Sequence, residues 1–151
     1  MSKLYFSVIG KNETETRIIG NSRQFTLTVD EPQELGGEDS APNPVEYLLA
    51  GFAGCFNVVG HLVAKELGFK INSLEFDVSG DIDPDGFLGK SEEVRPGFQN
   101  IDLNIKIDAN TDSITLAKWK TIVEKRCPVK DNISNPTPIN VNIKEHARLV
   151  A

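Results

Sequence analysis

The sequence has few of the residues from which metal sites and disulfide frameworks are built, with two cysteines and two histidines in 151 residues. No pair among Cys55, His61, Cys127 and His146 has the short spacing of a structural zinc site, so we expect no metal and no cofactor. The two cysteines are expected to be free thiols, because a structural disulfide is uncommon in the cytosol. A cysteine hydrolase also needs a base oriented by a third group, and the sequence indicates no such set.

Positive charge is scarce as well, with 16 Lys and Arg against 22 Asp and Glu and a net charge of -6. Nucleic acids and anionic membrane surfaces both require clustered Lys and Arg, so we expect neither as a partner. The first ten residues lack the apolar run of a signal peptide. The apolar stretch 45–64 is interrupted by Glu46, Asn57 and His61, which is typical of a buried helix rather than a membrane span. We therefore expect a cytoplasmic protein.

The length predicts one domain over residues 1–151. Helical spacing covers residues 113–126, and Cys127-Pro128 is expected to begin a new short turn or helix. Together with a long helix that begins at Asn43-Pro44, the element order is βββ-α-ββ-α-β, which predicts an α+β fold. Alternating apolar residues predict the strands, at 3–10, 14–19, 23–30, 71–82, 98–107 and 139–143.

The long helix is predicted to run from Asn43-Pro44 to about Leu67, with Gly68 ending it. Asn is a good N-cap, Pro is favoured in the first helical position, and Gly is favoured just after the last. Apolar residues cover most of its circumference, which is typical of a core helix. Four small residues lower its helix propensity but would let another backbone or a substrate approach closely: Ala50, Gly51, Ala53 and Gly54.

Three motifs in this order resemble the OsmC/Ohr superfamily. They are the loop Pro32–Gly37, the helix that begins at Asn43-Pro44 and carries Cys55, and the motif Cys127-Pro128-Val129. The resemblance covers nearly the whole chain and implies an OsmC-like domain. It also implies an intertwined homodimer, in which two long central helices are wrapped by sheets from both subunits and the active sites lie at the dimer interface.

The resemblance implies a thiol-dependent peroxidase that reduces organic hydroperoxides in oxidative or osmotic stress. Cys55 would be the peroxidatic thiol, which attacks the peroxide and becomes a sulfenic acid. Cys127 would be the resolving thiol, which forms a disulfide with it, and a dihydrolipoamide-like dithiol would reduce this disulfide. The alternative is an OsmC-like protein without catalysis, which binds an apolar small molecule at the dimer interface.

The resemblance also implies an arginine that favours the thiolate and a carboxylate that orients this arginine. Val45 stands where the carboxylate follows Asn-Pro in Ohr members, and Glu46 is one residue later, so Glu46 either serves the site or caps the helix.

The identity of this arginine is less well defined. The position that carries it in OsmC-type members corresponds to Leu35 here, and the position that carries it in Ohr-type members falls near Thr14. Arg17 is the nearest candidate, and Arg23 and Arg95 are the alternatives.

Overall fold

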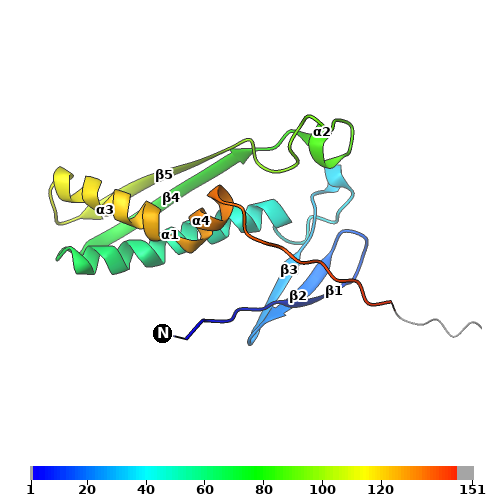
Figure 1. Ribbon diagram of the computed structural model, residues 1–151, viewed down its shortest axis with the longest axis horizontal. Helices are drawn as coiled ribbons and strands as arrows, with labels where there is room; N and C mark the ends of the chain where they lie inside the picture. The colour runs from blue at the N-terminus through cyan, green and yellow to red at the C-terminus, as the bar shows by residue number, and fades with distance from the viewer. Residues whose placement is uncertain (1, 146–151) are drawn as a thin grey trace, which may run out of the picture.

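The computed structural model describes residues 2–145, whereas Met1 and residues 146–151, which include His146, lie outside the described part (Figure 1). The chain forms a three-stranded meander, a long helix, a long two-stranded hairpin and further helices. Their bounds are β1 Ile9–Asn12, β2 Ile18–Ser22, β3 Phe25–Val29, η1 Gln33–Leu35, α1 Pro44–Glu66, β4 Ile71–Asp81, α2 Pro84–Phe87, β5 Asn100–Ala109, α3 Ser113–Arg126 and α4 Pro128–Ser134.

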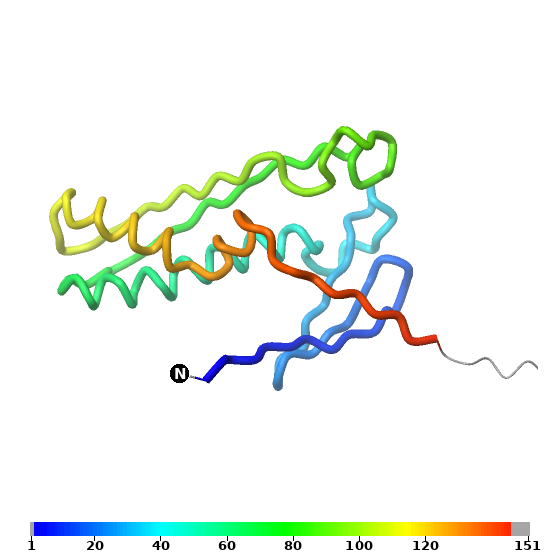
Figure 2. The backbone as a smooth tube through the Cα atoms, in the orientation of Figure 1, coloured from blue at the N-terminus to red at the C-terminus, as the bar shows by residue number. Residues whose placement is uncertain are grey.

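The helices and the long hairpin form one body, and the meander lies off the N-terminal end of α1 (Figures 1 and 2). Both sheets are antiparallel, with strand orders β1-β2-β3 and β4-β5. The β4–β5 register extends from Ile71 opposite Ala109 to Asp81 opposite Asn100. α1 packs against both α3 and β4. The observed architecture is the α+β class that the sequence predicts.

The start of α1 is held by a capping box, as the residues around Asn43-Pro44 predict. The side chain of Asn43 accepts a hydrogen bond from the backbone N–H of Glu46 at 2.9 Å, and the carboxylate of Glu46 accepts one from the N–H of Asn43 at 2.8 Å. These two bonds satisfy backbone donors that the first turn of a helix leaves without a partner. Gly68 follows the helix with φ of 81°, a left-handed conformation that glycine adopts without strain.

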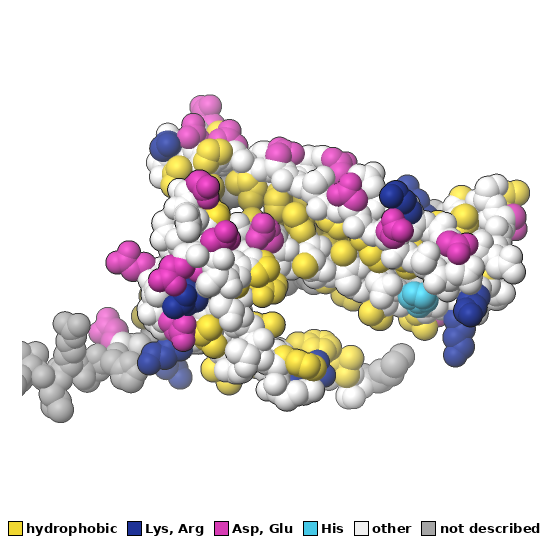
Figure 3. Space-filling view, turned by 180° about the vertical axis from the view of Figure 1, so that it is seen from behind, with side chains coloured by type: hydrophobic (Ala, Val, Ile, Leu, Met, Phe, Trp, Pro, Cys, Tyr) yellow, Lys and Arg dark blue, Asp and Glu magenta, His cyan; other side chains and the backbone are white. Residues whose placement is uncertain are grey.

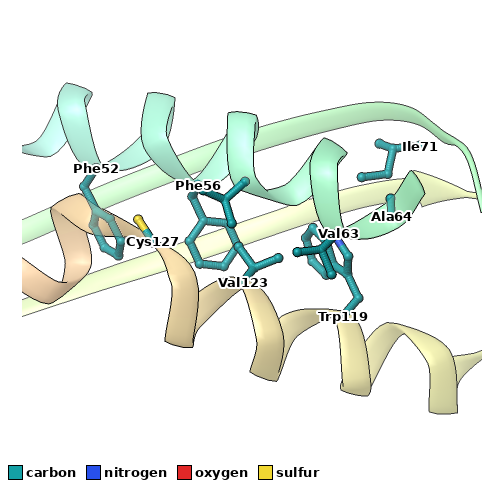
Figure 4. Close-up of a cluster of buried hydrophobic side chains, with 9 residues drawn as sticks. Phe52, Phe56, Val63, Ala64, Ile71, Trp119, Val123 and Cys127 are labelled. Carbon is teal, nitrogen blue, oxygen red and sulfur yellow. The ribbon is translucent and has the colours of Figure 1, made fainter. Parts of the chain in front are cut away.

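The core lies where α1, α3 and the hairpin meet (Figure 4). Phe56, Val63 and Val123 are almost fully buried, and Trp119 stacks edge-on against Phe56. The indole N–H of Trp119 donates to the carbonyl of Gly60 at 2.8 Å. A Cβ atom at Gly60 would lie 2.9 Å from the Trp119 ring, so glycine at this position is what lets α1 and α3 approach.

One side of α1 has no cover within the chain. Gly51 and Gly54 would meet no atom within 4 Å if each carried a Cβ, and Val58 and Leu62 are 67% and 48% exposed. The helix is long and apolar enough to cross a membrane by length and composition alone, a test that core helices also pass. Its opposite side packs into the core described above, so the predicted core helix is buried on one side only in the single chain.

Two predictions for the strands are wrong. The turn of the first hairpin spans residues 13–17 rather than Lys11-Asn12, which displaces the first two strands toward the C-terminus. Residues 139–143 form no strand, although their apolar residues alternate as predicted. Ile139, Val141 and Ile143 are 82%, 84% and 88% exposed. A strand requires a neighbour to accept and donate its backbone hydrogen bonds, and none of the described strands pairs with this segment.

Candidate active site

The two cysteines meet at the junction of α1 and α4, although they are far apart in the sequence. Their Sγ atoms lie 3.0 Å apart and share an S–H···S hydrogen bond, and both thiols are free. Cys55 is partly exposed, whereas Cys127 is 1% exposed. The structure therefore brings together the two residues that the sequence singles out as the working thiols.

The position of Cys127 follows from the proline after it. Pro128 disfavours the helical conformation in the residue before it, and Cys127 accordingly has extended backbone angles, with φ of -75° and ψ of 111°. α3 ends there, and α4 begins at Pro128 in a new direction (Figure 1). The Cys127 sulfur caps α4 by accepting the backbone N–H of Lys130 at 3.5 Å. The Cys-Pro sequence thus points the sulfur toward α1 and fixes it there.

The environment of Cys55 disfavours its thiolate form. Burial raises the pKa of Cys55 above its ordinary value, and the adjacent Cys127 sulfur raises it further. A backbone hydrogen bond from Val129 lowers the pKa of Cys55, but it is not the largest of these effects. Since the thiolate is the nucleophile, the raised pKa lowers the fraction of Cys55 that can react.

We expect alkylation of Cys55 by iodoacetamide to have its pH midpoint above the value of about 8.5 that is typical of a free cysteine. The sign follows from the raised pKa, which lowers the thiolate fraction at pH 7. Mass spectrometry of the labelled peptide measures the midpoint. The Cys127→Ala variant should have a lower midpoint, because one of the two raising effects is removed. A wild-type midpoint below about 8.5 would contradict the prediction.

The three candidate arginines lie in different places. Arg17 is the last residue of the turn of the first hairpin and binds the carboxylates of Glu13, at 3.0 Å, and Glu38. The guanidinium of Arg23 lies 5.1 Å from the centre of the Phe25 ring. Arg95 lies in the loop between α2 and β5 and lines a pocket. Within residues 2–145, neither sulfur has a hydrogen bond to a guanidinium.

Glu46 is part of the helix cap. Both its backbone and its carboxylate are hydrogen-bonded to Asn43. The structure thus supports the capping role, one of the two roles that the sequence left open for this residue.

Asp30 is a polar residue that sequence reasoning missed. It is 0% exposed, and its carboxylate accepts hydrogen bonds from the hydroxyls of Ser40 and Thr16, at 2.8 and 3.0 Å, and from nearby backbone N–H groups. The bond from Ser40 is the main reason why the pKa of Asp30 lies well below its ordinary value. Asp30 thereby connects the turn that precedes Arg17 to the loop that carries Glu38. An aspartate directly after an alternating apolar strand, with Ser and Thr elsewhere, is too common a pattern to have indicated this role.

Two pockets are lined in part by residues that follow Cys127 in the chain. The Arg95 pocket has a volume of about 720 Å³ and is lined by Arg95 and by apolar side chains that include Val45, Leu48, Phe98, Val129 and Ile133. The α3–β5 pocket has a volume of about 550 Å³ and is lined by Trp119, Lys120, Lys130 and the inward side chains of β5. Val129 lines the first pocket, and Lys130, whose backbone N–H donates to the Cys127 sulfur, lines the second, whereas neither cysteine is among the lining residues of either pocket. Residues 2–145 contain no cluster of three His, Cys, Asp or Glu residues placed to hold a metal ion.

The chain is thus a small α+β protein with one free thiol on its central helix and a second at hydrogen-bond distance from it. The chain belongs to the OsmC-like protein family, which matches residues 37–142. Comparison with curated proteins gives no match.

Solved structures of the same family share the fold. An OsmC-like protein from Mycoplasma pneumoniae is 22% identical with a TM-score of 0.76, over 89% of both chains. An organic hydroperoxide resistance protein from Legionella pneumophila is 21% identical with a TM-score of 0.65, over 87% of this chain and 91% of its own. One from Elizabethkingia anophelis is 20% identical with a TM-score of 0.63, over 87% of this chain and 90% of its own.

Proposed function

We propose that this protein is a thiol-dependent peroxidase that reduces organic hydroperoxides in oxidative or osmotic stress, with Cys55 and Cys127 as its catalytic residues. The observation that carries the proposal is the 3.0 Å separation of the two sulfurs in a largely apolar surrounding. Two solved structures with the same fold are described as organic hydroperoxide resistance proteins, which favours the same substrate class here.

The reaction needs only the two thiols, a peroxide and a reductant. The Cys55 thiolate attacks the distal oxygen of R–O–OH, the O–O bond breaks, and protonation of the departing oxygen releases the alcohol R–OH. The resulting sulfenic acid is attacked by the Cys127 sulfur, which releases water and forms the disulfide. A dihydrolipoamide-like dithiol then reduces the disulfide by two exchange steps and becomes a disulfide itself. Neither a metal nor a cofactor enters these steps.

Activation of Cys55 is assigned to Arg17 in this proposal. Glu13 and Glu38 bind Arg17, which is how a carboxylate would orient the guanidinium. Because the raised pKa of Cys55 disfavours the thiolate, the proposal requires Arg17 to approach Cys55 during turnover. Glu46 contributes by fixing the start of α1, the helix that carries Cys55.

Oxidation by cumene hydroperoxide provides the direct test. One equivalent should convert the reduced protein to a disulfide between Cys55 and Cys127, because the resolving sulfur is already in contact with the attacked one. Peptide mapping without reduction identifies the bond, and titration of free thiols counts its formation. Hydrogen peroxide at the same concentration is the control. It should oxidise the thiols more slowly than cumene hydroperoxide does, since the side chains around them are apolar. Two titratable thiols that persist after cumene hydroperoxide treatment would contradict the proposal.

We also propose that the protein is a homodimer that pairs through the uncovered side of α1. This side is formed by Gly51, Gly54, Val58 and Leu62, and its small residues would let a second α1 approach closely. Hydrophobic side chains also form a band along the body of the molecule in the view from behind (Figure 3). A contiguous apolar surface of this kind is typical of a protein interface.

We expect Gly54→Arg to convert the dimer to a monomer. The arginine side chain would occupy the space that a second helix needs, while Gly to Arg in a helix is favourable by up to about 1 kcal/mol, so the chain should still fold. Light scattering coupled to size-exclusion chromatography measures the mass. Thr121→Arg, on the exposed side of α3, is the matched control and should remain dimeric. A Gly54→Arg variant with the mass of the wild-type protein would exclude this interface.

A second candidate function is binding of an apolar small molecule without catalysis. The Arg95 pocket and the α3–β5 pocket favour it, because their walls are mainly apolar and their volumes are within the range of ligand sites, about 300–1,000 Å³. The cumene hydroperoxide experiment separates the two functions, since a binding protein would keep both thiols. We further propose that the protein acts in the cytoplasm, where free thiols persist, without nucleic acid or membrane as a partner.

A further inference from the structure

We infer that Asp30 is a positioning residue, which holds Arg17 and the carboxylate of Glu38 in a fixed relation to each other. The inference rests on the proposed function, in which Arg17 activates Cys55. Its basis is a buried carboxylate that accepts hydrogen bonds from both of the segments on which Arg17 and Glu38 stand.

The two oxygens of the Asp30 carboxylate each hold one of these segments. Oδ1 accepts a hydrogen bond from the hydroxyl of Thr16, the residue before Arg17, at 3.0 Å. Oδ2 accepts hydrogen bonds from the hydroxyl and the N–H of Ser40, at 2.8 and 3.2 Å, and from the N–H of Glu38 at 3.3 Å. One side chain thus fixes both the backbone beside Arg17 and the backbone that carries its carboxylate partner.

The guanidinium of Arg17 depends on the same loop. Its Nη1 binds the carboxylate of Glu38 and also donates to the hydroxyl of Ser40 at 3.5 Å. This hydroxyl donates in turn to Asp30, so it lies between the buried carboxylate and the guanidinium. A movement of loop 38–40 away from Asp30 would therefore displace both oxygen atoms of the loop that face Arg17.

The attachment to Asp30 persists over the pH range in which a thiol ionises. Asp30 is 0% exposed, and the hydrogen bond from Ser40 is the main reason why its pKa lies well below the ordinary value. A buried charge without hydrogen bonds is costly, so both segments remain attached to the ionised carboxylate. Glu38 would consequently accompany Arg17 when Arg17 approaches Cys55.

Asp30→Asn tests the inference, because it keeps the size of the side chain but replaces one acceptor by a donor. Whichever way the amide is turned, its NH₂ group would face a backbone N–H, that of Glu31 on the Oδ1 side or those of Glu38 and Ser40 on the Oδ2 side. A backbone N–H cannot rotate to become an acceptor. The variant should therefore loosen one of the two segments.

The first measurement is the rate at which phenylglyoxal modifies Arg17 in the absence of peroxide, followed by mass spectrometry. Modification requires the guanidinium to leave its carboxylates, so Asp30→Asn should raise the rate about two- to tenfold, as expected for one lost hydrogen bond. Asp112→Asn is the matched control, because Asp112 also accepts an N–H and a hydroxyl, those of Thr115, but at the start of α3. It should keep the wild-type rate. An unchanged rate in Asp30→Asn, or an equal rise in Asp112→Asn, would overturn the inference.

The pH profile of peroxide reduction tests whether Asp30 acts through Arg17. In Asp30→Asn, kcat/KM for cumene hydroperoxide should fall about two- to tenfold. Its pH midpoint should rise, because Arg17 would stabilise the Cys55 thiolate for less of the time. The loss of a negative charge by itself could only lower the midpoint, since a nearby negative charge disfavours the thiolate. A lowered midpoint would contradict the inference.

The Arg17→Ala background separates positioning from a general loss of structure. If Asp30 acts through Arg17, adding Asp30→Asn to Arg17→Ala should leave kcat/KM unchanged, whereas a general loss would add to that of the single variant. An additive loss would overturn the inference.

Thr16→Val is the variant to use if Asp30→Asn does not fold, since it keeps the shape and removes only the hydroxyl that reaches Oδ1. It should raise the phenylglyoxal rate at Arg17 as well, and an unchanged rate would overturn the inference. If the rate rises but no peroxide oxidises the thiols, the proposed function fails and the Asp30 assignment holds. If cumene hydroperoxide is reduced but Asp30→Asn changes neither the phenylglyoxal rate nor the pH midpoint, the assignment fails and the peroxidase function holds.

Discussion

Cys55→Ser is expected to abolish the reduction of organic hydroperoxides, lowering the rate by about a thousandfold or more, to the background of free peroxide. Serine has nearly the same size, so the core around Phe52 and Phe56 should be retained. Its hydroxyl is far less nucleophilic than a thiol and has no adjacent base. The measurement is consumption of cumene hydroperoxide with a dithiol as reductant.

Cys127→Ser is the matched variant, because it removes the other sulfur of the same pair. It should consume one equivalent of peroxide and leave Cys55 as a sulfenic acid, which a sulfenic-acid reagent such as dimedone detects. Sustained turnover by Cys127→Ser with a dithiol would remove the resolving role from Cys127. Full activity of Cys55→Ser would show that Cys55 is not the peroxidatic residue.

Trp119→Ala should lower the free energy of unfolding by about 3–5 kcal/mol, the largest effect on stability that we expect from one substitution. Trp119 is 3% exposed and fills the contact between α1 and α3. The change leaves a cavity and removes the only side-chain partner found for the Gly60 carbonyl among the described residues. Chemical denaturation followed by circular dichroism gives the free energy, with protein concentration matched because a dimer gains stability with concentration.

Trp119→Phe separates the two contributions. It keeps most of the apolar volume but loses the indole N–H, so its cost should be about 1–2 kcal/mol for the lost hydrogen bond and reduced packing. Gly60→Ala should be destabilising as well, because its Cβ would meet the Trp119 ring. A Trp119→Ala variant as stable as the wild-type protein would contradict the role given to this contact.

The sequence predicted the helices better than the strands, for a physical reason. The ends of α1 are determined by local groups, the Asn43-Pro44 cap and Gly68, which act within one turn. The end of α3 at Cys127-Pro128 is likewise a local effect of proline. Residues 139–143 have the alternation of a strand, but a strand depends on a neighbour that a local pattern does not specify. The apolar side chains of this segment alternate as predicted, but they are exposed. No strand in the described part of the chain pairs with the segment.

The sequence indicated the two cysteines of the candidate site but not its arginine. The resemblance paired Cys55 with Cys127, and the structure places the two sulfurs in contact. The arginine could not be chosen from the sequence, because Arg17, Arg23 and Arg95 lie in loops and turns whose position depends on tertiary contacts. The structure shows a different partner for each: carboxylates for Arg17, an aromatic ring for Arg23 and an open pocket for Arg95.

The unequal exposure of the two sulfurs has a consequence for the direction of thiol exchange. Cys127 is sealed inside the protein, whereas the surface reaches Cys55. An incoming thiol can therefore attack only the Cys55 sulfur of a Cys55–Cys127 disulfide. The mixed disulfide would form on Cys55, and Cys127 would be the leaving group. Glutathione or any other small thiol would form its mixed disulfide with Cys55, the same sulfur that reacts with the peroxide. The oxidant and the reductant would therefore reach the site by the same route, one after the other.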